Sequence, residues 1–144
     1  MYSDMAEGLL YFGGAHMDRK DSIDCVSDLH REDDVDRFIN TQSASKLKML
    51  MVTAHLCSPC VHIYPSYVTL AMNFRDLVDF GRVDVEAEGL GSLYETLRIR
   101  EAPTFITYCN GKEVDRLVSG NRGDLVGHLL NVATRFGIDP PRPK

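Results

Sequence analysis

The sequence of 144 residues predicts one α/β domain built on a mixed, mostly parallel β-sheet. Strand-like apolar runs alternate with helix-like segments, and this alternation implies parallel crossovers. Near the end of the chain, Asn110-Gly111 separates two strand-like runs and indicates a two-residue hairpin, which adds an antiparallel edge. The predicted order of elements is therefore β-α-β-α-β-α-β-β-α.

The first half of the domain is predicted to contain two strands and two helices. Residues 22–29 form a short strand, and residues 31–42 form a helix with its apolar positions on one face. Residues 47–52 are nearly all apolar, which is typical of a buried central strand. A second helix follows Cys57, and Pro65 is expected to kink it because proline removes an N–H bond and clashes with the preceding turn.

The second half is predicted to contain three strands and two helices. Residues 81–85 form a strand, and residues 90–99 suit a short helix. The hairpin strands are residues 104–109 and 112–118. Residues 123–136 carry a helical apolar pattern and close the domain, and the glycine that follows fits the helix end.

Three segments describe the expected domain organisation. Residues 1–24 are interpreted as an N-terminal extension or a linker from an upstream module, and residues 25–137 as the domain. Residues 138–144 are rich in proline and are expected to form an extended, mobile tail.

Composition excludes several classes of partner. The formal net charge of −5 argues against general binding to nucleic acid or to an anionic membrane. No apolar run approaches the roughly 20 residues that span a bilayer. The first residues lack a secretory or transit pattern, so the chain is expected to be cytosolic or a mature or trimmed fragment. The 4 cysteines are too few for a disulfide-stapled secreted domain and favour a reducing compartment.

The motif Cys57-Ser58-Pro59-Cys60 carries the chemistry. It follows the central apolar run and opens a predicted helix, where unpaired N–H groups favour a thiolate on the first cysteine. A thiolate is the nucleophile of thiol–disulfide exchange, so the pair predicts redox chemistry.

Two other interpretations of this pair remain open. A structural zinc site usually needs four ligands, but only Cys25 and Cys109 remain, and His55 and His62 complete no finger. Neither a metal nor a cofactor is therefore expected. Two inert core cysteines are the second alternative. Cys25 and Cys109 are expected to be strand residues packed as small hydrophobes, with a regulatory thiol as the alternative.

Ordered landmarks along the chain resemble the thioredoxin family over residues 25–137. They are the apolar strand before the cysteine pair, the pair itself, Pro65, Ala102-Pro103-Thr104 ahead of a strand, and Gly111 and Gly120 on either side of the next strand. The resemblance implies the thioredoxin fold, with helices on both faces of the sheet. It also implies a cis peptide bond at Ala102–Pro103, facing the cysteines.

Within the family, the chain is most similar to the C-terminal module of drought-induced tandem thioredoxins of plant chloroplasts. This similarity is carried by residues 29–35, by residues 57–61 with Tyr64-Pro65, and by residues 102–105, and residues 10–13 resemble the join to an upstream module. This branch implies a location in the chloroplast stroma and a role in stress response. The implied partners are oxidised proteins such as peroxiredoxins or methionine sulfoxide reductases. The electrons would come from a separate donor, either a reductase or glutathione and glutaredoxin.

Three positions depart from the family pattern. Met51 stands where the family usually has a buried acid that assists proton transfer at the second thiol. Leu56 stands where the family has a tryptophan, and Ser58 replaces the usual glycine. Met51 and Leu56 favour a second hypothesis, a thioredoxin-fold interaction module without turnover. A third hypothesis is a disulfide oxidase or isomerase in an oxidising compartment.

The expected mechanism is that of a protein disulfide reductase. Cys57 attacks the disulfide or sulfenic acid of a partner protein, and Cys60 resolves the mixed disulfide. Pro59 stiffens the motif, and Ser58 either places a hydroxyl near the thiolate or caps the helix.

Two further site residues are expected to support this chemistry. His55, as an imidazolium, is expected either to lower the thiol pKa or to be an exposed strand-end residue, whereas His62 is interpreted as a surface residue. Ala102, next to Pro103, is expected to present backbone groups to an extended partner segment.

Overall fold

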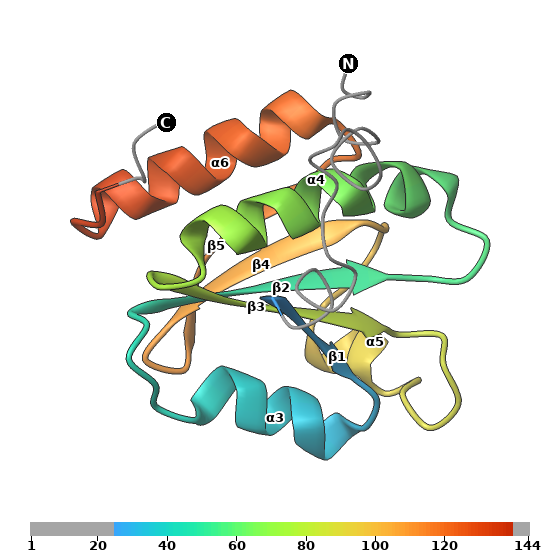
Figure 1. Cartoon of the computed structure of the whole chain (residues 1–144). Helices are drawn as coiled ribbons and strands as arrows, with labels where there is room; N and C mark the ends of the chain where they lie inside the picture. The colour runs from blue at the N-terminus through green and yellow to red at the C-terminus, as the bar shows by residue number, and fades with distance from the viewer. Residues whose placement is uncertain (1–24, 140–144) are drawn as a thin grey trace.

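Residues 25–139 are described by the structure, which is a computed structural model. The predicted extension at residues 1–24 and the last five residues of the predicted tail lie outside the described residues. Figure 1 shows a central sheet with α4 and α6 on one face and α3 and α5 on the other. The thioredoxin fold predicted from the sequence has this layered arrangement.

The element order matches the predicted one. The strands are β1 (Val26–Leu29), β2 (Leu47–Thr53), β3 (Val78–Asp84), β4 (Thr104–Cys109) and β5 (Lys112–Val118). The helices are α3 (Glu32–Asn40), α4 (Ser58–Phe74), α5 (Leu93–Thr96) and α6 (Arg122–Arg135). The two hairpin strands have their predicted bounds, and Asn110 and Gly111 adopt positive φ angles of 54° and 80°, as a tight two-residue turn requires.

The strands lie in the order β1-β3-β2-β4-β5. β3 pairs in parallel with both β1 and β2, whereas β4 runs antiparallel to β2 and to β5. The sheet is therefore mixed, and β4 is the strand that runs against the others. The antiparallel strand β4 lies inside the sheet, and only its hairpin partner β5 lies at the edge.

Alternate residues of β2 bury themselves on opposite faces of the sheet. Leu47, Met49 and Met51 join the core beneath α4 and α6. Leu50 and Val52 join a second core on the side of α3 and α5. All of these side chains are fully buried, because β2 is covered on both faces. This central strand ends at Thr53, directly before the segment that carries the cysteine pair.

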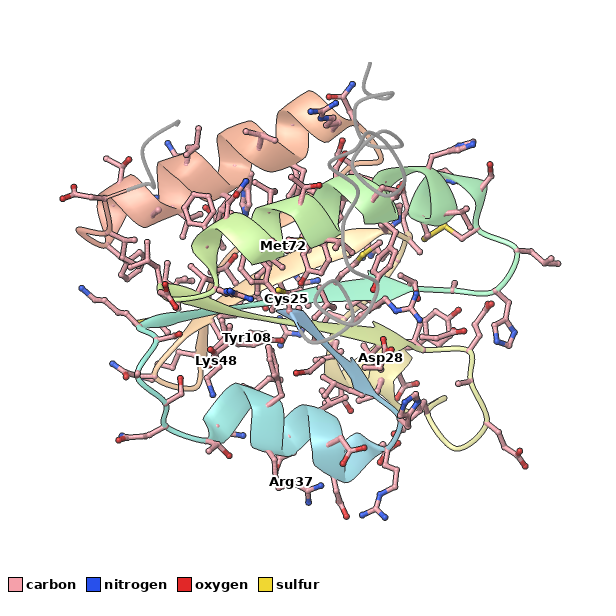
Figure 2. The ribbon with its side chains drawn as sticks, in the orientation of Figure 1. Cys25, Asp28, Arg37, Lys48, Met72 and Tyr108 are labelled. Carbon is pink, nitrogen blue, oxygen red and sulfur yellow. A yellow bond between two sulfur atoms is a disulfide. The ribbon has the colours of Figure 1, made fainter. Side chains whose placement is uncertain are left out.

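The side of the sheet that faces α3 holds a buried cation. Figure 2 shows Lys48 and Tyr108 between the sheet and α3. The Lys48 ammonium donates to the carbonyl oxygens of Phe38, at 2.7 Å, and of Thr41. These carbonyls belong to the C-terminal end of α3, where a positive charge is favourable. Burial raises the pKa of Tyr108 to about 12, so its hydroxyl stays neutral.

Three sequence predictions need correction. The strand predicted over residues 81–85 begins at Val78, because Val78 and Phe80 also pack into the core under α4. The helix predicted over residues 90–99 spans only Leu93–Thr96, and Arg98 follows it with a φ of 55°, which ends the helix. Cys25 is not a strand residue, since it precedes β1 and has helical backbone.

Candidate active site

The two cysteines of the motif meet at the N-terminus of α4. Cys57 is the N-cap residue, and its Sγ accepts a hydrogen bond from the Cys60 amide at 3.2 Å. The pair forms a disulfide, with Cα atoms 5.3 Å apart. Cys57 is half-buried, whereas Cys60 is only 5% exposed. The first sulfur therefore has the favourable position at the helix N-terminus that the sequence predicted.

Ser58 and Pro59 form the first turn of the helix. Cys57 provides the cap, so of the two roles expected for Ser58, helix capping is wrong; Ser58 is the exposed first helical residue. Pro59 fits this turn because its missing N–H has no partner in the helix anyway. Gly120 approaches Pro59 so closely that a Cβ atom there would lie 2.9 Å from the Cβ of Pro59. The loop after β5 thereby holds the motif from the side.

A cis-proline loop lies against the first cysteine. The Ala102–Pro103 peptide bond is cis, which confirms the expectation from the family resemblance. The carbonyl oxygen of Ala102 lies 3.6 Å from the Cys57 Sγ. Just beyond the proline, the Thr104 hydroxyl donates to the Glu101 carbonyl at 2.6 Å and so closes the loop on itself.

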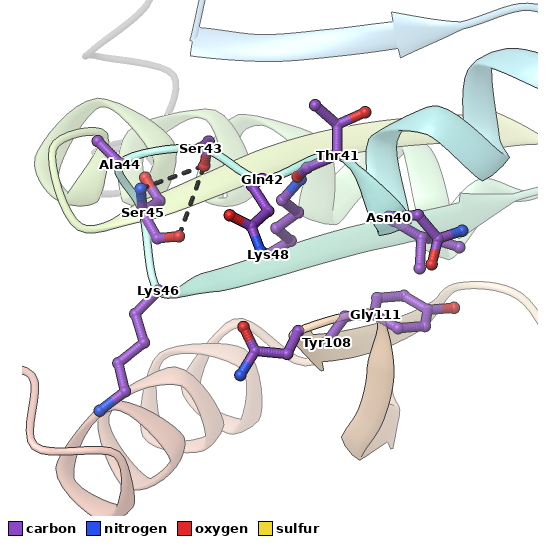
Figure 3. Close-up of a pocket in the computed structure, with 12 residues that line it drawn as sticks. Asn40, Thr41, Gln42, Ser43, Ala44, Ser45, Lys46, Lys48, Tyr108 and Gly111 are labelled. Atoms are coloured by element: carbon purple, nitrogen blue, oxygen red, sulfur yellow. Dashed lines mark hydrogen bonds between the residues drawn. The ribbon is translucent and has the colours of Figure 1, made fainter.

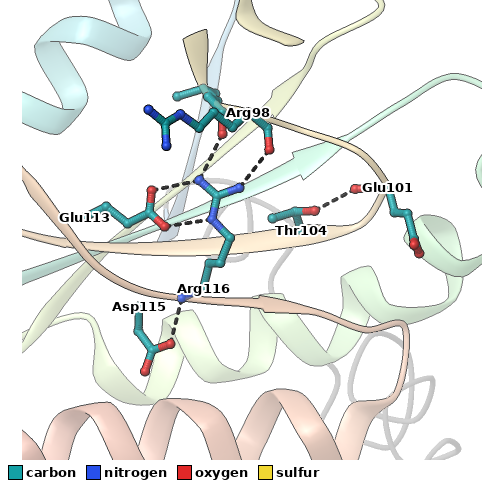
Figure 4. Close-up of polar contacts among 7 residues, drawn as sticks. Arg98, Glu101, Thr104, Glu113, Asp115 and Arg116 are labelled. Carbon is teal, nitrogen blue, oxygen red and sulfur yellow. Dashed lines mark hydrogen bonds and ion pairs between the residues drawn. The ribbon is translucent and has the colours of Figure 1, made fainter. Parts of the chain in front are cut away.

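Arg116 on β5 anchors the chain that leads into this loop (Figure 4). Its guanidinium donates to the carbonyl oxygens of Leu97, at 2.9 Å, and Arg98, at 3.0 Å. Two further bonds of 2.7 Å reach the Glu113 carboxylate, which raises the pKa of Arg116. The guanidinium therefore fixes the turn at Arg98, four residues before Ala102.

Replacing Arg116 with methionine is expected to lower the free energy of unfolding by about 1–3 kcal/mol, because two loop carbonyls and Glu113 lose charge-assisted hydrogen bonds. Urea unfolding followed by circular dichroism measures this loss. Arg100→Met is the matched control: Arg100 is an exposed arginine of the same loop, and its replacement is expected to change stability by no more than about 0.5 kcal/mol. Equal effects of the two substitutions would show that Arg116 does not anchor the loop.

A cavity of about 690 Å³ opens beside the cysteine pair. It is lined by Thr53, Ala54, Leu56, Cys57, Ser58, Cys60, Val61, Tyr64, Arg82 and Asp84. Leu56 is fully exposed at its rim, with a φ of 51°, and Val61 is 70% exposed. Met51 is fully buried in the same core cluster as Cys60, so the position of the family's acid is apolar here.

His55 lies in the turn two residues after the end of β2 and is exposed. Its Nε2 atom is 3.0 Å from the Asp84 Oδ2 atom, so the imidazole is directed to this carboxylate. The His55 amide donates to Glu86 at 2.6 Å, and the Tyr94 hydroxyl donates to the same carboxyl group at 2.8 Å. These two hydrogen bonds hold the pKa of Glu86 below its ordinary value.

The other candidate residues lie apart from this site. His62 is exposed on α4, as predicted. Cys25 and Cys109 are half-buried free cysteines packed against the core under α4 and α6. In residues 25–139, no group of three or more His, Cys, Asp or Glu side chains is placed to hold a metal ion. The helices of this part are also too short or too polar to cross a membrane.

Sequence reasoning missed Arg82, Asp84 and Arg116. Arg82 and Asp84 are polar residues at alternate positions of β3, and this period of two places both on the face that carries α4. That signal was available in the sequence. Arg116 gave no such signal, because its partners at Leu97 and Arg98 lie 19 and 18 residues away along the chain.

A cysteine pair at a helix N-terminus, beside a cis-proline loop on a mixed sheet, defines a domain of the thiol–disulfide exchange class. The chain belongs to the thioredoxin family, whose sequence profile matches residues 29–131. Proteins of this family are thiol–disulfide oxidoreductases, and the CxxC pair of that chemistry is present here.

The similar proteins include several plant thioredoxins. The chain is 29% identical over 124 residues to the chloroplastic thioredoxin-like protein CDSP32 of Arabidopsis thaliana, a match that covers 85% of this chain and 39% of that protein. It is 34% identical over 80 residues to thioredoxin H5 of Oryza sativa, covering 56% of this chain and 57% of that protein. The matches thus span less than two thirds of either relative.

Solved thioredoxins share the fold. Oxidised thioredoxin from Plasmodium falciparum superposes with a TM-score of 0.65 at 28% identity, covering 75% of this chain and 98% of that one. Thioredoxin f2 of Chlamydomonas reinhardtii gives a TM-score of 0.67 at 24% identity, covering 74% of this chain and 95% of that one.

Proposed function

We propose that this chain is a protein disulfide reductase that acts on oxidised proteins of the chloroplast stroma, such as peroxiredoxins or methionine sulfoxide reductases. One observation supports the proposal most strongly, the position of the Cys57 Sγ atom. This atom lies at the N-terminus of α4, accepts a hydrogen bond from the Cys60 amide and lies 3.6 Å from the Ala102 carbonyl oxygen of the cis-proline loop. The similarity to chloroplastic CDSP32 supports the location.

The proposed roles follow from exposure and position. Cys57 is the more accessible sulfur and attacks the partner, and Cys60, which is buried behind it, resolves the mixed disulfide. Pro59 holds the first turn rigid, and Ser58 is exposed beside Cys57. Ala102 offers its backbone to an extended partner segment, while the cis bond at Pro103 turns that backbone toward the sulfur.

The electrons must come from another molecule, since the proposed reaction consumes one dithiol per turnover. Thioredoxins receive electrons from a reductase, and we propose the same here, with glutathione and glutaredoxin as the alternative donor.

The test is a stoichiometric transfer between purified proteins. The reduced chain is mixed with an oxidised 2-Cys peroxiredoxin, an oxidised methionine sulfoxide reductase or insulin, and the thiols are alkylated and counted by mass. We expect one partner disulfide reduced for each Cys57–Cys60 disulfide formed. Reduction of the insulin disulfides alone would refute the proposed partners but not the disulfide reductase activity.

A second candidate function is a thioredoxin-fold interaction module without turnover. The fully buried Met51 and the fully exposed Leu56 favour it, because they replace the family's acid and its tryptophan. This function requires binding but no exchange. A complex with an oxidised partner that forms without any disulfide transfer would support it and contradict the reductase.

A further inference from the structure

Resolution by Cys60 needs a route for its proton. Cys60 is 5% exposed and packs in the same cluster as Met51, Ile63 and Tyr67. An apolar environment disfavours the thiolate, so the buried thiol keeps its proton until a nearby group accepts it. Met51 cannot accept a proton, so the residue at the position of the family's acid does not act as a base in this reaction.

Asp84 lies on β3, two residues after Arg82, and is on the same face of the sheet as Met51. The register of β2 and β3 pairs Met51 with Arg82 and Thr53 with Asp84. Alternation along β3 directs Arg82 and Asp84 to the side of α4, the side on which Met51 and Cys60 are packed. Asp84 and Cys60 both line the cavity of about 690 Å³, which is open to solvent.

The Asp84 carboxylate is held from two sides. Its Oδ2 atom is 3.0 Å from the His55 Nε2 atom, and its Oδ1 atom accepts a hydrogen bond of 2.9 Å from the backbone amide of Glu86. Each carboxylate oxygen can accept two hydrogen bonds, so both keep a free site. The group is therefore oriented by the protein and still able to bind a water molecule in the cavity.

The other charged and titratable groups around Asp84 are not placed to accept the Cys60 proton. Arg82 lies over the Tyr64 ring, 4.9 Å from its centre, and pairs with Asp28 at 3.2 Å. Burial raises the pKa of Tyr64, so its hydroxyl stays neutral. The Glu86 carboxylate binds the Tyr94 hydroxyl and the His55 amide, and it does not line the cavity. Among the described residues that line this cavity, Asp84 is the one carboxylate.

We propose that Asp84 accepts the proton of the Cys60 thiol, through water in the cavity, and that His55 positions Asp84 for this task. The proposal rests on the reductase function proposed above. In the step, the Cys60 sulfur attacks the Cys57 sulfur of the mixed disulfide, and the bond between Cys57 and the partner sulfur breaks. The partner leaves as a thiolate with the electron pair of the broken bond. The Cys60 proton passes through water to Asp84 and then to solvent.

Rapid mixing with the aromatic disulfide 5,5′-dithiobis(2-nitrobenzoate) separates the two steps. Attack by Cys57 releases one coloured thionitrobenzoate, and resolution by Cys60 releases the second. The full reduced chain carries alanine at both Cys25 and Cys109 in every sample, so that only the pair reacts.

Asp84→Asn is expected to leave the first release unchanged and to slow the second about 100-fold at pH 7, the lower end of the usual general-base effect. The deficit should vanish near pH 10, where hydroxide removes the thiol proton without help. Asp84→Glu keeps an acid and should restore most of the rate. A circular dichroism spectrum that matches that of the parent chain shows that the variant is folded.

Glu86→Gln is the matched control, because it removes the negative charge of a neighbouring side chain that does not line the cavity. Its second release is expected to match that of the parent chain. A second release that Asp84→Asn leaves unchanged from pH 6 to 8 would overturn the proposal, as would an equal loss in Glu86→Gln. If the parent chain released only one thionitrobenzoate, the reductase function itself would fail, which separates the two outcomes.

Discussion

Replacing Cys57 with serine is expected to abolish disulfide reduction. The serine hydroxyl is a far weaker nucleophile than a thiolate, and no other described thiol lies at the helix N-terminus beside the Ala102 carbonyl. Turnover of insulin with dithiothreitol as donor measures the effect, and the rate should fall to that of dithiothreitol alone. The remaining thiol at Cys60 should not substitute, since it is 5% exposed.

Cys60→Ser is the matched variant, because it leaves the attack intact and removes only resolution. It should therefore accumulate a covalent mixed disulfide with the partner, visible by mass and reversible with excess reductant. Normal turnover by Cys60→Ser, or retained turnover by Cys57→Ser, would contradict the proposed order of attack and resolution.

Replacing Met51 with aspartate, the kind of side chain the family has there, is expected to destabilise this chain strongly. Met51 is fully buried between Arg82 of β3 and Phe105 of β4 in the register of the sheet, within an apolar cluster. A fully buried carboxyl group without a partner has its pKa raised by up to about 3–5 units, and with an unfolded pKa of about 3.9 this costs about 4 kcal/mol at pH 7. Arg82 is committed to Asp28 and to the Tyr64 ring.

The pH dependence identifies the cause of this loss. Because the folded-state pKa of the new carboxyl group would lie above its unfolded value of about 3.9, the folded state binds more protons above that pH. The added penalty is therefore small below about pH 4 and grows as the pH rises towards the folded-state pKa. Met51→Leu, a swap of similar volume, should cost less than about 1.5 kcal/mol at any pH. Urea unfolding at pH 4 and pH 7 measures both variants. A loss below about 1 kcal/mol for Met51→Asp at pH 7 would show that a charge is accommodated there.

The features that could be predicted from the sequence are local. The hairpin at Asn110-Gly111 depends on two adjacent residues that tolerate positive φ, and both have it. The position of Cys57 at a helix start follows from an apolar strand that ends just before it and a proline in the first turn. The cis bond at Pro103 came from family resemblance, because an arbitrary X–Pro bond is cis in only about 5–6% of cases.

The features that sequence reasoning missed depend on contacts between distant segments. The contact between His55 and Asp84 joins the turn after β2 to the end of β3, 29 positions away, and no local pattern indicates which carboxylate the imidazole meets. The helix predicted over residues 90–99 is shorter in the structure, where Arg98 adopts a positive φ just after it. Nothing in an arginine side chain indicates a positive φ from the sequence. Arg116 of β5 binds the carbonyl of Arg98.

The central claim is that Cys57 and Cys60 form a reversible dithiol–disulfide couple poised to reduce other proteins. Equilibrating the full chain in thiol–disulfide buffers of defined potential, with alkylation and mass counting of free thiols, tests it most directly. We expect one two-electron step at about −270 mV or below, the range of reductases of this kind. A step at about −120 to −180 mV would instead indicate an oxidase or isomerase. If no disulfide formed between Cys57 and Cys60 in any buffer, the redox function would be contradicted.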